Sequence, residues 1–400
     1  MRILIADAFS EKHLDLFRQM GLEVDYQPNL SKADLPGVIA GVAILVVRST
    51  EVTAETIQTG HSLALIVRAG AGVNTIDRKA ASARGVYVAN CPGKNSIAVA
   101  ELTLGLLLAL DRRIPDNVID LRAGTWNKKE YSKAGGLFGR TLGVIGTGSI
   151  GQEVIRRARA FGMHVIAWSR RLDEQTARDL GVERMQTVPE LCGRADAVSL
   201  HVALTPETRG LLGEAAIARL RPRAMVVNAA RAEVLDSAAL KRAIAQKQLR
   251  VALDVFDAEP GGATGPFTDE IVKLPGVYGT HHIGASTDQA QEAIAVETIR
   301  IVREFLERGE VPNCVNIAQR PPAACQLNVR HLDRVGVLAE VLGAIRRHQI
   351  NVGEMENVVF EGSQAAVARI KLAARPAPEL LEEIRSHTDV IIHVDVVELG

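Results

Sequence analysis

A glycine-rich loop between a strand-like and a helix-like segment constrains the fold of this chain more than any other feature. The apolar run at 142–146 leads into Gly146-Thr-Gly148-Ser-Ile-Gly151, which precedes a helical stretch and a second strand-like run at 164–168. In such a βαβ unit, Gly146 forms the turn, Gly148 lets a pyrophosphate approach the backbone, and Gly151 lets the helix pack closely. We therefore predict a dinucleotide site here; the alternative is a tight turn without a ligand.

Strand-like and helix-like segments alternate on both sides of this loop, which predicts parallel βαβ units. We expect two Rossmann-like, doubly wound parallel-sheet α/β domains. Residues 96–123 form a long apolar run that predicts one long helix, crossing between domains or packing on a partner subunit. A helix at 287–308 is expected to carry the chain back onto the first domain.

The order of strand-like and helix-like segments changes after the proline pair at 321–322. The tail follows the order βαββαβ, which is typical of a ferredoxin-like α+β domain. We predict a discontinuous substrate-binding domain (1–95 and 285–318), a dinucleotide-binding domain (96–284) and a small C-terminal domain (323–400).

Composition bounds the class of protein. Forty-seven basic side chains balance forty-seven acidic ones, which speaks against a nucleic-acid or anionic-membrane partner. The four cysteines have no metal or disulfide spacing, so we expect no metal site. The N-terminus has no signal-peptide pattern and no apolar run is long enough to span a bilayer, so we expect a cytoplasmic protein without a membrane partner.

The strand that follows the glycine loop ends in Ser169-Arg170-Arg171, where a carboxylate would accept a hydrogen bond from the adenosine ribose of NAD. A serine and two guanidinium groups suit a 2′-phosphate instead. We predict that NADP is accepted, and these residue types also suit a preference for NADP over NAD; the alternative is that both arginines lie on a solvated loop.

Three more strands end in polar clusters that contain Arg231, Glu259 and His282. The carboxyl ends of parallel strands meet at one cleft, so these groups can converge beside the cofactor. Removing a hydroxyl proton while hydride leaves the same carbon requires a base such as His282, and Glu259 suits the far ring nitrogen. Arg231 suits the substrate carboxylate and oxyanion. His281 and His282 adjoin on an extended segment and should face opposite ways, so we interpret His281 as structural.

Seven ordered segments resemble the D-isomer-specific 2-hydroxy-acid dehydrogenase family, particularly its phosphoglycerate dehydrogenase branch. They are VVRST at 46–50, VRAGAGVNTID at 67–77, VANCPGKNSIAVAELTLG at 88–105, LGVIGTGSIG at 142–151, NAARAEVLD at 228–236, ALDVFDAEP at 252–260 and HHIGASTDQAQE at 281–292. The resemblance implies catalytic roles for Arg231, Glu259 and His282.

The resemblance also implies binding residues. Its cofactor contacts would be Ser149, Ile150, Ala229, Ala230, Arg231, Asp254 and the residues from His282 to Ala285. Its substrate contacts would be the backbone of Ala71, Gly72 and Val73, with Arg48 and Ser49 near a distal phosphate. Lys94 and Asn95 would lie in the segment that crosses between the domains.

The chain departs from the family pattern at two places: His281 replaces a usual proline, and Ser169 replaces a usual aspartate. The resemblance implies hydride transfer between a nicotinamide cofactor and 3-phospho-D-glycerate, giving 3-phosphohydroxypyruvate in the first step of L-serine biosynthesis. Ser169 favours the alternative of an NADPH-dependent glyoxylate or hydroxypyruvate reductase. A more remote alternative is a nicotinamide-sensing, non-enzymatic corepressor-like protein.

The C-terminal domain resembles an ACT domain, on the segments 331–338 and 350–352. The resemblance implies an amino-acid effector, L-serine, held near His331, Asp333, Gly336 and Asn351. The alternative is a dimerisation module without a ligand. We expect a homodimer or homotetramer, because ACT modules and the apolar segment 96–123 both suit partners.

Overall fold

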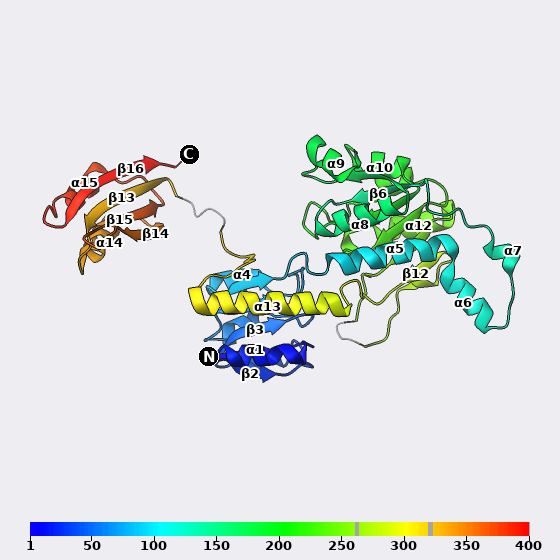
Figure 1. Cartoon of the computed structure of the whole chain (residues 1–400), viewed down its shortest axis with the longest axis horizontal. Coiled ribbons are helices and arrows are strands. Elements are labelled where there is room, and N and C mark those ends of the chain that lie inside the picture. Colours follow the sequence, from blue (N-terminus) through cyan, green and yellow to red (C-terminus); the bar gives the residue numbers. More distant parts are fainter. Residues whose placement is uncertain (261–263, 319–322, 400) are drawn as a thin grey trace. The chain divides into compact units, whose positions relative to one another are not determined.

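The computed structural model describes residues 1–260, 264–318 and 323–399. Its chain forms two compact units, Met1–Asn316 and Ile317–Gly400. The first unit holds two parallel sheets, and the second holds one antiparallel sheet (Figure 1).

The first sheet contains five parallel strands in the order β2-β1-β3-β4-β5. Its strands are β1 (Arg2–Ile5), β2 (Glu23–Tyr26), β3 (Val42–Val47), β4 (Leu65–Arg68) and β5 (Tyr87–Asn90). Its connecting helices are η1 (Glu11–His13), α1 (Leu14–Gln19), α2 (Leu35–Val38), α3 (Ala54–Thr59) and α4 (Arg78–Ala83). The central strand β3 is almost wholly buried, as expected for a parallel sheet covered on both faces.

Helix α13 (Asp288–Arg308) returns to this first sheet from the end of the second one (Figure 1). Its residues Ile294, Ile299 and Val302 belong to the same hydrophobic cluster as Ile3 and Val46. The distant segment therefore completes the core on one face of the sheet.

The second sheet contains seven parallel strands in the order β12-β11-β10-β9-β6-β7-β8. Its strands are β6 (Thr141–Ile145), β7 (His164–Trp168), β8 (Glu183–Arg184), β9 (Ala197–Leu200), β10 (Met225–Asn228), β11 (Arg250–Leu253) and β12 (Val277–Gly279). Its helices are α8 (Ser149–Ala160), α9 (Glu174–Leu180), α10 (Val188–Arg194), α11 (Glu214–Arg219), η2 (Ala232–Val234), α12 (Ser237–Lys247) and η3 (Glu270–Lys273). The strand order reverses between β6 and β9, which is where ligands bind in open α/β sheets.

The segment 96–123 forms two helices, so the prediction of one long helix is wrong. Helix α5 (Ser96–Arg112) packs on α8 and is largely buried, whereas α6 (Ile114–Arg122) has no buried residue. Arg113 separates them in a left-handed conformation, and Pro115 lies in the first turn of α6. A short helix, α7 (Lys128–Tyr131), follows.

The C-terminal unit has the predicted βαββαβ order. Its elements are β13 (Cys325–Leu332), α14 (Val337–Arg347), β14 (Val352–Val359), β15 (Ala365–Leu372), α15 (Pro378–Arg385) and β16 (Ile391–Glu398). The sheet is antiparallel with the order β14-β15-β13-β16, and the cluster that includes Leu327, Ile345 and Ile384 joins the helices to one face. The predicted fold class, with two Rossmann-like sheets and a small α+β domain, is confirmed.

Candidate active site

The glycine loop joins β6 to α8, and each glycine meets a different constraint. Gly146 has a φ of 100°, and a Cβ there would lie 2.4 Å from the His201 carbonyl oxygen. A Cβ on Gly151 would lie 1.9 Å from the Gly146 carbonyl oxygen, whereas a Cβ on Gly148 would meet nothing within 4 Å. The fold itself therefore requires glycine at 146 and 151. Gly148 leaves open space at the N-terminus of α8, beside exposed Ser149 and half-buried Ile150, which fits a diphosphate.

The adenosine end of such a ligand would lie by the residues after β7. Ser169 is half-buried there, and Arg170 and Arg171 are exposed. The Nη1 of Arg170 lies 3.7 Å from Oε2 of Glu207, a residue of the loop that follows β9. The predicted arginines are thus on a surface loop, but one of them already has an anionic partner.

His282 and Glu259 are in direct contact. His282 Nδ1 lies 2.7 Å from Glu259 Oε2, and Glu259 Oε1 accepts a hydrogen bond of 2.9 Å from the Phe256 amide. Partial burial raises the pKa of Glu259, but the hydrogen bonds from His282 and Phe256 outweigh it and leave that pKa below its ordinary value. Glu259 is therefore a carboxylate at neutral pH, and it holds one nitrogen of the imidazole.

The segment that carries His282 is fixed by the buried carboxylate of Asp254. Asp254 Oδ1 accepts hydrogen bonds from the Thr280 hydroxyl at 2.6 Å and the Ile283 amide at 2.9 Å. Its Oδ2 accepts one from the Gly284 amide at 2.9 Å. Both oxygens of Asp254 thus hold the loop on either side of the histidine.

The prediction that His281 and His282 lie on an extended segment is wrong at His282. Its φ is 51°, in the left-handed region, because the chain bends sharply where Asp254 grips it. Both histidines are exposed, so the alternation of side chains along a strand does not separate them. What distinguishes them is the Glu259 carboxylate, which contacts His282.

Arg231 reaches from the end of β10 toward the first sheet. Its Nη1 donates to the Ala230 carbonyl at 2.6 Å, and a Cβ on Gly72 would lie 2.2 Å from its Nη2. Asn228 holds the turn, since its side chain donates to the Arg231 carbonyl and accepts from the Ala230 amide. The guanidinium therefore lies against the Gly72 loop, near Glu259, whose charge acts on it.

The predicted substrate loop follows β4. Ala71, Gly72 and Val73 are half-buried, and their amides donate no hydrogen bond to any residue that the structure describes. Such amides are available to a carboxylate. At the end of β3, the amides of Arg48 and Ser49 donate to Asp7 Oδ2, which fixes that neighbouring turn.

Arg68, the last residue of β4, was not predicted as a site residue from the sequence. Its Nε is buried without a hydrogen-bond partner among the described residues, and a Cβ on Gly70 would lie 1.7 Å from its Nη1. Burial lowers its pKa to about 10, with further lowering by the charges of Arg231 and Arg48. The available signal was its position: Arg68 ends its strand next to a glycine-rich loop, and Arg48 directly follows the last residue of the neighbouring strand.

The remaining predicted residues lie around these groups. Ala229 and Ala230 are buried at the end of β10, and Ala285 is half-buried beyond the Asp254 clamp. Lys94 lies 3.3 Å from Glu297 of α13, so it joins the two segments that link the parallel sheets. Asn95 precedes α5, and its Oδ1 is buried without a hydrogen-bond partner in the described part of the chain.

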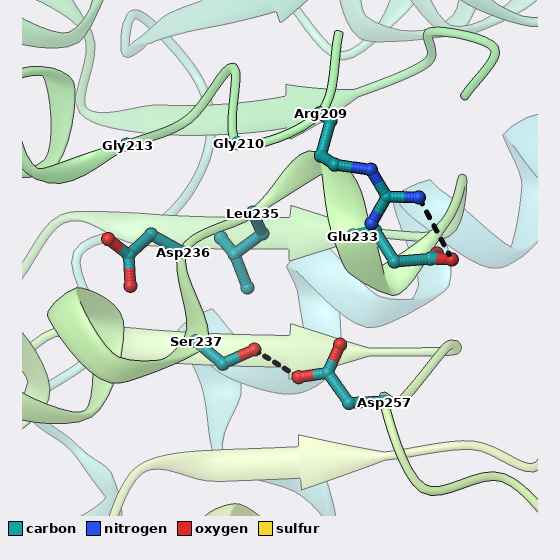
Figure 2. A pocket seen from close by; sticks show the side chains of 8 residues that line it. All are labelled: Arg209, Gly210, Gly213, Glu233, Leu235, Asp236, Ser237 and Asp257. Atoms are coloured by element: carbon teal, nitrogen blue, oxygen red, sulfur yellow. Dashed lines mark hydrogen bonds and ion pairs between the residues drawn. The ribbon is translucent and has the colours of Figure 1, made fainter. Parts of the chain in front are cut away.

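A hollow of about 390 Å³ lies beside this site (Figure 2). Its lining residues are Arg209, Gly210, Gly213, Glu233, Leu235, Asp236, Ser237 and Asp257. Arg209 faces Glu233, and the Ser237 hydroxyl donates to Asp257 at 2.6 Å. Three carboxylates against one guanidinium make this hollow unsuited to an anionic substrate, and none of Arg231, Glu259 and His282 lines it.

In the C-terminal unit, the four predicted effector residues differ in access. His331 is only 1% exposed, with its ring nitrogens 2.8 Å from the Leu332 carbonyl and 3.0 Å from Asn357 Oδ1. Asp333, Gly336 and Asn351 are exposed. The ring of His331 is thus buried and holds the end of β13, whereas Asp333, Gly336 and Asn351 lie on the surface of the C-terminal unit.

The described residues contain neither a membrane-spanning helix nor a cluster of metal-binding side chains. No helix in 1–260, 264–318 or 323–399 is long and apolar enough to cross a membrane. No group of three or more His, Cys, Asp or Glu side chains in these ranges is arranged to hold a metal ion.

Comparisons with known proteins bear on the family of this chain. Residues 104–284 match the D-isomer specific 2-hydroxyacid dehydrogenase, NAD binding domain. The chain is 40% identical to a D-3-phosphoglycerate dehydrogenase of Methanocaldococcus jannaschii over 375 residues, 93% of this chain and 67% of that protein. It is 40% identical to a hydroxypyruvate reductase of Thermotoga maritima over 296 residues, 74% of this chain and 94% of that protein.

A solved structure from Thermus thermophilus, the TT0316 protein, is similar with a TM-score of 0.71 and 34% identity, over 79% of this chain and 100% of that one. These matches confirm the predicted family, enzyme class and nicotinamide cofactor. The chain belongs to the D-isomer specific 2-hydroxyacid dehydrogenase family, and it is an NAD(P)-dependent dehydrogenase with a small hydroxy-acid substrate.

Proposed function

We propose that this dehydrogenase oxidises 3-phospho-D-glycerate at C2, in the first step of L-serine biosynthesis. The observation that carries the proposal is the position of buried Arg68 against the Gly70 loop, where burial and then the positive charges of Arg231 and Arg48 lower its pKa. Holding like charges together costs free energy, and a ligand with several negative charges offsets it. A substrate with both a carboxylate and a phosphate supplies those charges. The relatives named D-3-phosphoglycerate dehydrogenase support the same substrate.

His282 is the proposed general base. Its Nδ1 faces Glu259, which leaves Nε2 to take the proton from the C2 hydroxyl. Glu259 fixes the tautomer and stabilises the imidazolium that forms. A nicotinamide cofactor held at the glycine loop by Gly146, Gly148 and Gly151 would supply the acceptor for the hydride from C2.

Arg231 is the proposed clamp on the substrate carboxylate and C2 oxygen. Its guanidinium lies against the Gly72 loop, whose three amides are available for the same carboxylate. A planar, permanently charged fork stabilises the charge that develops on the oxygen in either direction of the reaction. Arg68 and Arg48 would bind the distal phosphate at the ends of β4 and β3.

The decisive experiment compares 3-phosphohydroxypyruvate with hydroxypyruvate and glyoxylate as substrates for reduction. We expect kcat/KM to favour the phosphorylated acid by about 100-fold, because charge-assisted hydrogen bonds to phosphate contribute about 1.5–3 kcal/mol each. Arg68→Met should lower kcat/KM for that acid by about 10- to 100-fold and leave hydroxypyruvate within about threefold. Arg78→Met, on the exposed surface of α4, is the matched control.

Reduction of glyoxylate or hydroxypyruvate is the second candidate. It is favoured by Ser169 and Arg170 and by the Thermotoga maritima relative, which the match covers almost completely. A wild-type preference for the unphosphorylated acids, with equal losses on all substrates in Arg68→Met, would replace the first proposal by this one.

The domain roles and the assembly follow from the same elements. We assign substrate binding to residues 1–95 and 285–318, and cofactor binding to residues 96–284.

Helix α6 exposes four apolar side chains, Ile114, Val118, Ile119 and Leu121, and the exposed Trp126 lies nearby in sequence. An exposed apolar helix of this kind suits a symmetric contact with a second copy of the chain.

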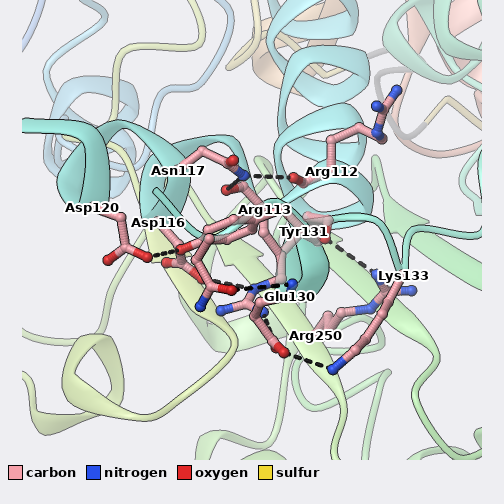
Figure 3. Close-up of polar contacts among 11 residues, drawn as sticks. Arg112, Arg113, Asp116, Asn117, Asp120, Glu130, Tyr131, Lys133 and Arg250 are labelled. Carbon is pink, nitrogen blue, oxygen red and sulfur yellow. Dashed lines mark hydrogen bonds and ion pairs between the residues drawn. The ribbon is translucent and has the colours of Figure 1, made fainter. Parts of the chain in front are cut away.

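Polar contacts hold the residues around α6 in place (Figure 3). Arg113 binds Asp116 at 2.9 Å and Glu130 at 2.8 Å and stacks on the Tyr131 ring at 4.9 Å. The Tyr131 hydroxyl donates to Asp120 at 2.7 Å. These bonds join α7 to α6, so the apolar side chains are presented on an ordered element.

The C-terminal unit is proposed to be an ACT module that binds L-serine through the exposed residues Asp333, Gly336 and Asn351. Gly336 lies at the N-terminus of α14 with a φ of 94°, and its backbone is exposed there. Inhibition of turnover by L-serine tests this role, and Asp333→Ala should weaken it. Unchanged activity at saturating L-serine would leave the module a role in assembly alone.

A further inference from the structure

The contact between Arg170 and Glu207 lies where the cofactor selectivity of this enzyme is set. Arg170 follows β7 and Glu207 follows β9, and these strands flank β6, which carries the glycine loop. The Arg170 Nη1 to Glu207 Oε2 distance is 3.7 Å, and both side chains are more than 60% exposed. One of the two guanidinium groups predicted to bind a 2′-phosphate is therefore already paired with a carboxylate.

Glu207 is held as an anion in a folded turn. Hydrogen bonds from the Thr205 hydroxyl and the Glu207 amide, with the charge of Arg170, keep the pKa of Glu207 below its ordinary value. The Thr208 hydroxyl accepts from the Thr205 amide at 2.8 Å and donates to the Ala203 carbonyl at 2.6 Å, which fixes the turn. The negative charge thus stays close to Arg170 instead of moving freely with a long side chain.

We propose that Glu207 is a specificity-determining residue for the cofactor, which holds Arg170 in the free protein and opposes binding of a 2′-phosphate. NADP must displace the carboxylate from Arg170 and then lie beside it, whereas NAD leaves the pair intact. Ser169 stands where a carboxylate usually repels the 2′-phosphate of NADP. The carboxylate of Glu207, on the loop that follows β9, supplies part of that repulsion instead. This inference rests on nicotinamide cofactor binding and is independent of the proposed substrate.

The test measures binding of 2′,5′-ADP and 5′-AMP to the full chain by calorimetry, so that neither hydride transfer nor the hydroxy acid enters the readout. Glu207→Gln should tighten 2′,5′-ADP binding by about three- to tenfold, since an exposed ion pair and repulsion of a dianion are both removed. Its effect on 5′-AMP should stay within about twofold. Glu270→Gln is the matched control, because Glu270 is also an exposed carboxylate, pairs with Lys273 and precedes the edge strand β12, away from β7 and β9.

A double-mutant cycle tests whether Glu207 acts through Arg170. In an Arg170→Gln background, Glu207→Gln should change 2′,5′-ADP binding by less than about twofold. The gain in the single variant should also shrink between about 0.05 M and 0.5 M NaCl, because salt screens exposed charges. An equal gain with and without Arg170, equal tightening of both nucleotides, or no binding of 2′,5′-ADP by either protein would overturn the proposal.

Discussion

His282 and Glu259 form the pair on which the proposed chemistry depends. His282→Gln removes the base but keeps a polar side chain, so kcat should fall by about 100- to 10,000-fold. Binding of 5′-AMP should stay within about twofold, because the glycine loop lies on another strand end. Steady-state kinetics and calorimetry measure the two effects. A variant that keeps its full activity would exclude His282 as the base.

The same pair makes stability depend on pH. The pKa of Glu259 is lowered in the folded protein, so its hydrogen bonds stabilise the fold above the ordinary carboxyl pKa. This contribution is lost as the pH falls through the lowered pKa. Glu259→Gln should reduce the free energy of unfolding by about 1 kcal/mol at neutral pH. In urea titrations, the difference from wild type should shrink as the pH falls below the ordinary carboxyl pKa; a constant difference would contradict it.

Asp254 supports the histidine loop with both carboxylate oxygens. Asp254→Asn keeps the shape but turns one acceptor into a donor that faces an amide or a hydroxyl. We expect a loss of about 1–3 kcal/mol in the free energy of unfolding, since a buried donor is left unpaired. Urea unfolding measures it, and Asp257→Asn on the nearby surface is the control. Equal stability in both variants would mean that the clamp contributes nothing.

At the scale of elements, the glycine loop after β6 contains one glycine that the fold requires, Gly151, and one that the proposed diphosphate requires, Gly148. Gly151→Ala places a methyl group against the Gly146 carbonyl and should lower stability by about 1–3 kcal/mol. Gly148→Ala meets open space, so the melting temperature should not change, whereas 5′-AMP binding should weaken at least about tenfold. Thermal melts and calorimetry on both variants distinguish the two. Full nucleotide binding by Gly148→Ala would contradict the placement of the diphosphate.

The elements that sequence predicted are those fixed by local pattern. The glycine loop, the strand ends at Arg231, Glu259 and His282, and the βαββαβ tail follow from periodicity and short motifs. The break at Arg113 was missed, although Pro115 signals a first helical turn there. Arg68 was missed because its meaning depends on burial beside Arg48 and Arg231, which are distant in sequence.

At the scale of the whole molecule, assembly is the expected use of α6. Ile119 is 64% exposed, so a charge there should not disturb the fold of one chain. Ile119→Glu should shift a dimer or tetramer to smaller species in light scattering, with an unchanged circular dichroism spectrum. Leu342→Glu, on the exposed surface of α14, is a matched control for the other unit. An unchanged mass would place the interface elsewhere.

The left-handed backbone of His282 has a consequence for evolution. Holding a non-glycine residue at a φ of 51° reduces the free energy of unfolding by on the order of 1 kcal/mol or more, whereas glycine adopts that conformation without steric strain. Selection for stability alone would replace this histidine, and selection for turnover retains it. Folding stability and catalytic rate therefore favour different residues at position 282. Relatives that have lost catalytic activity should have replaced the histidine there.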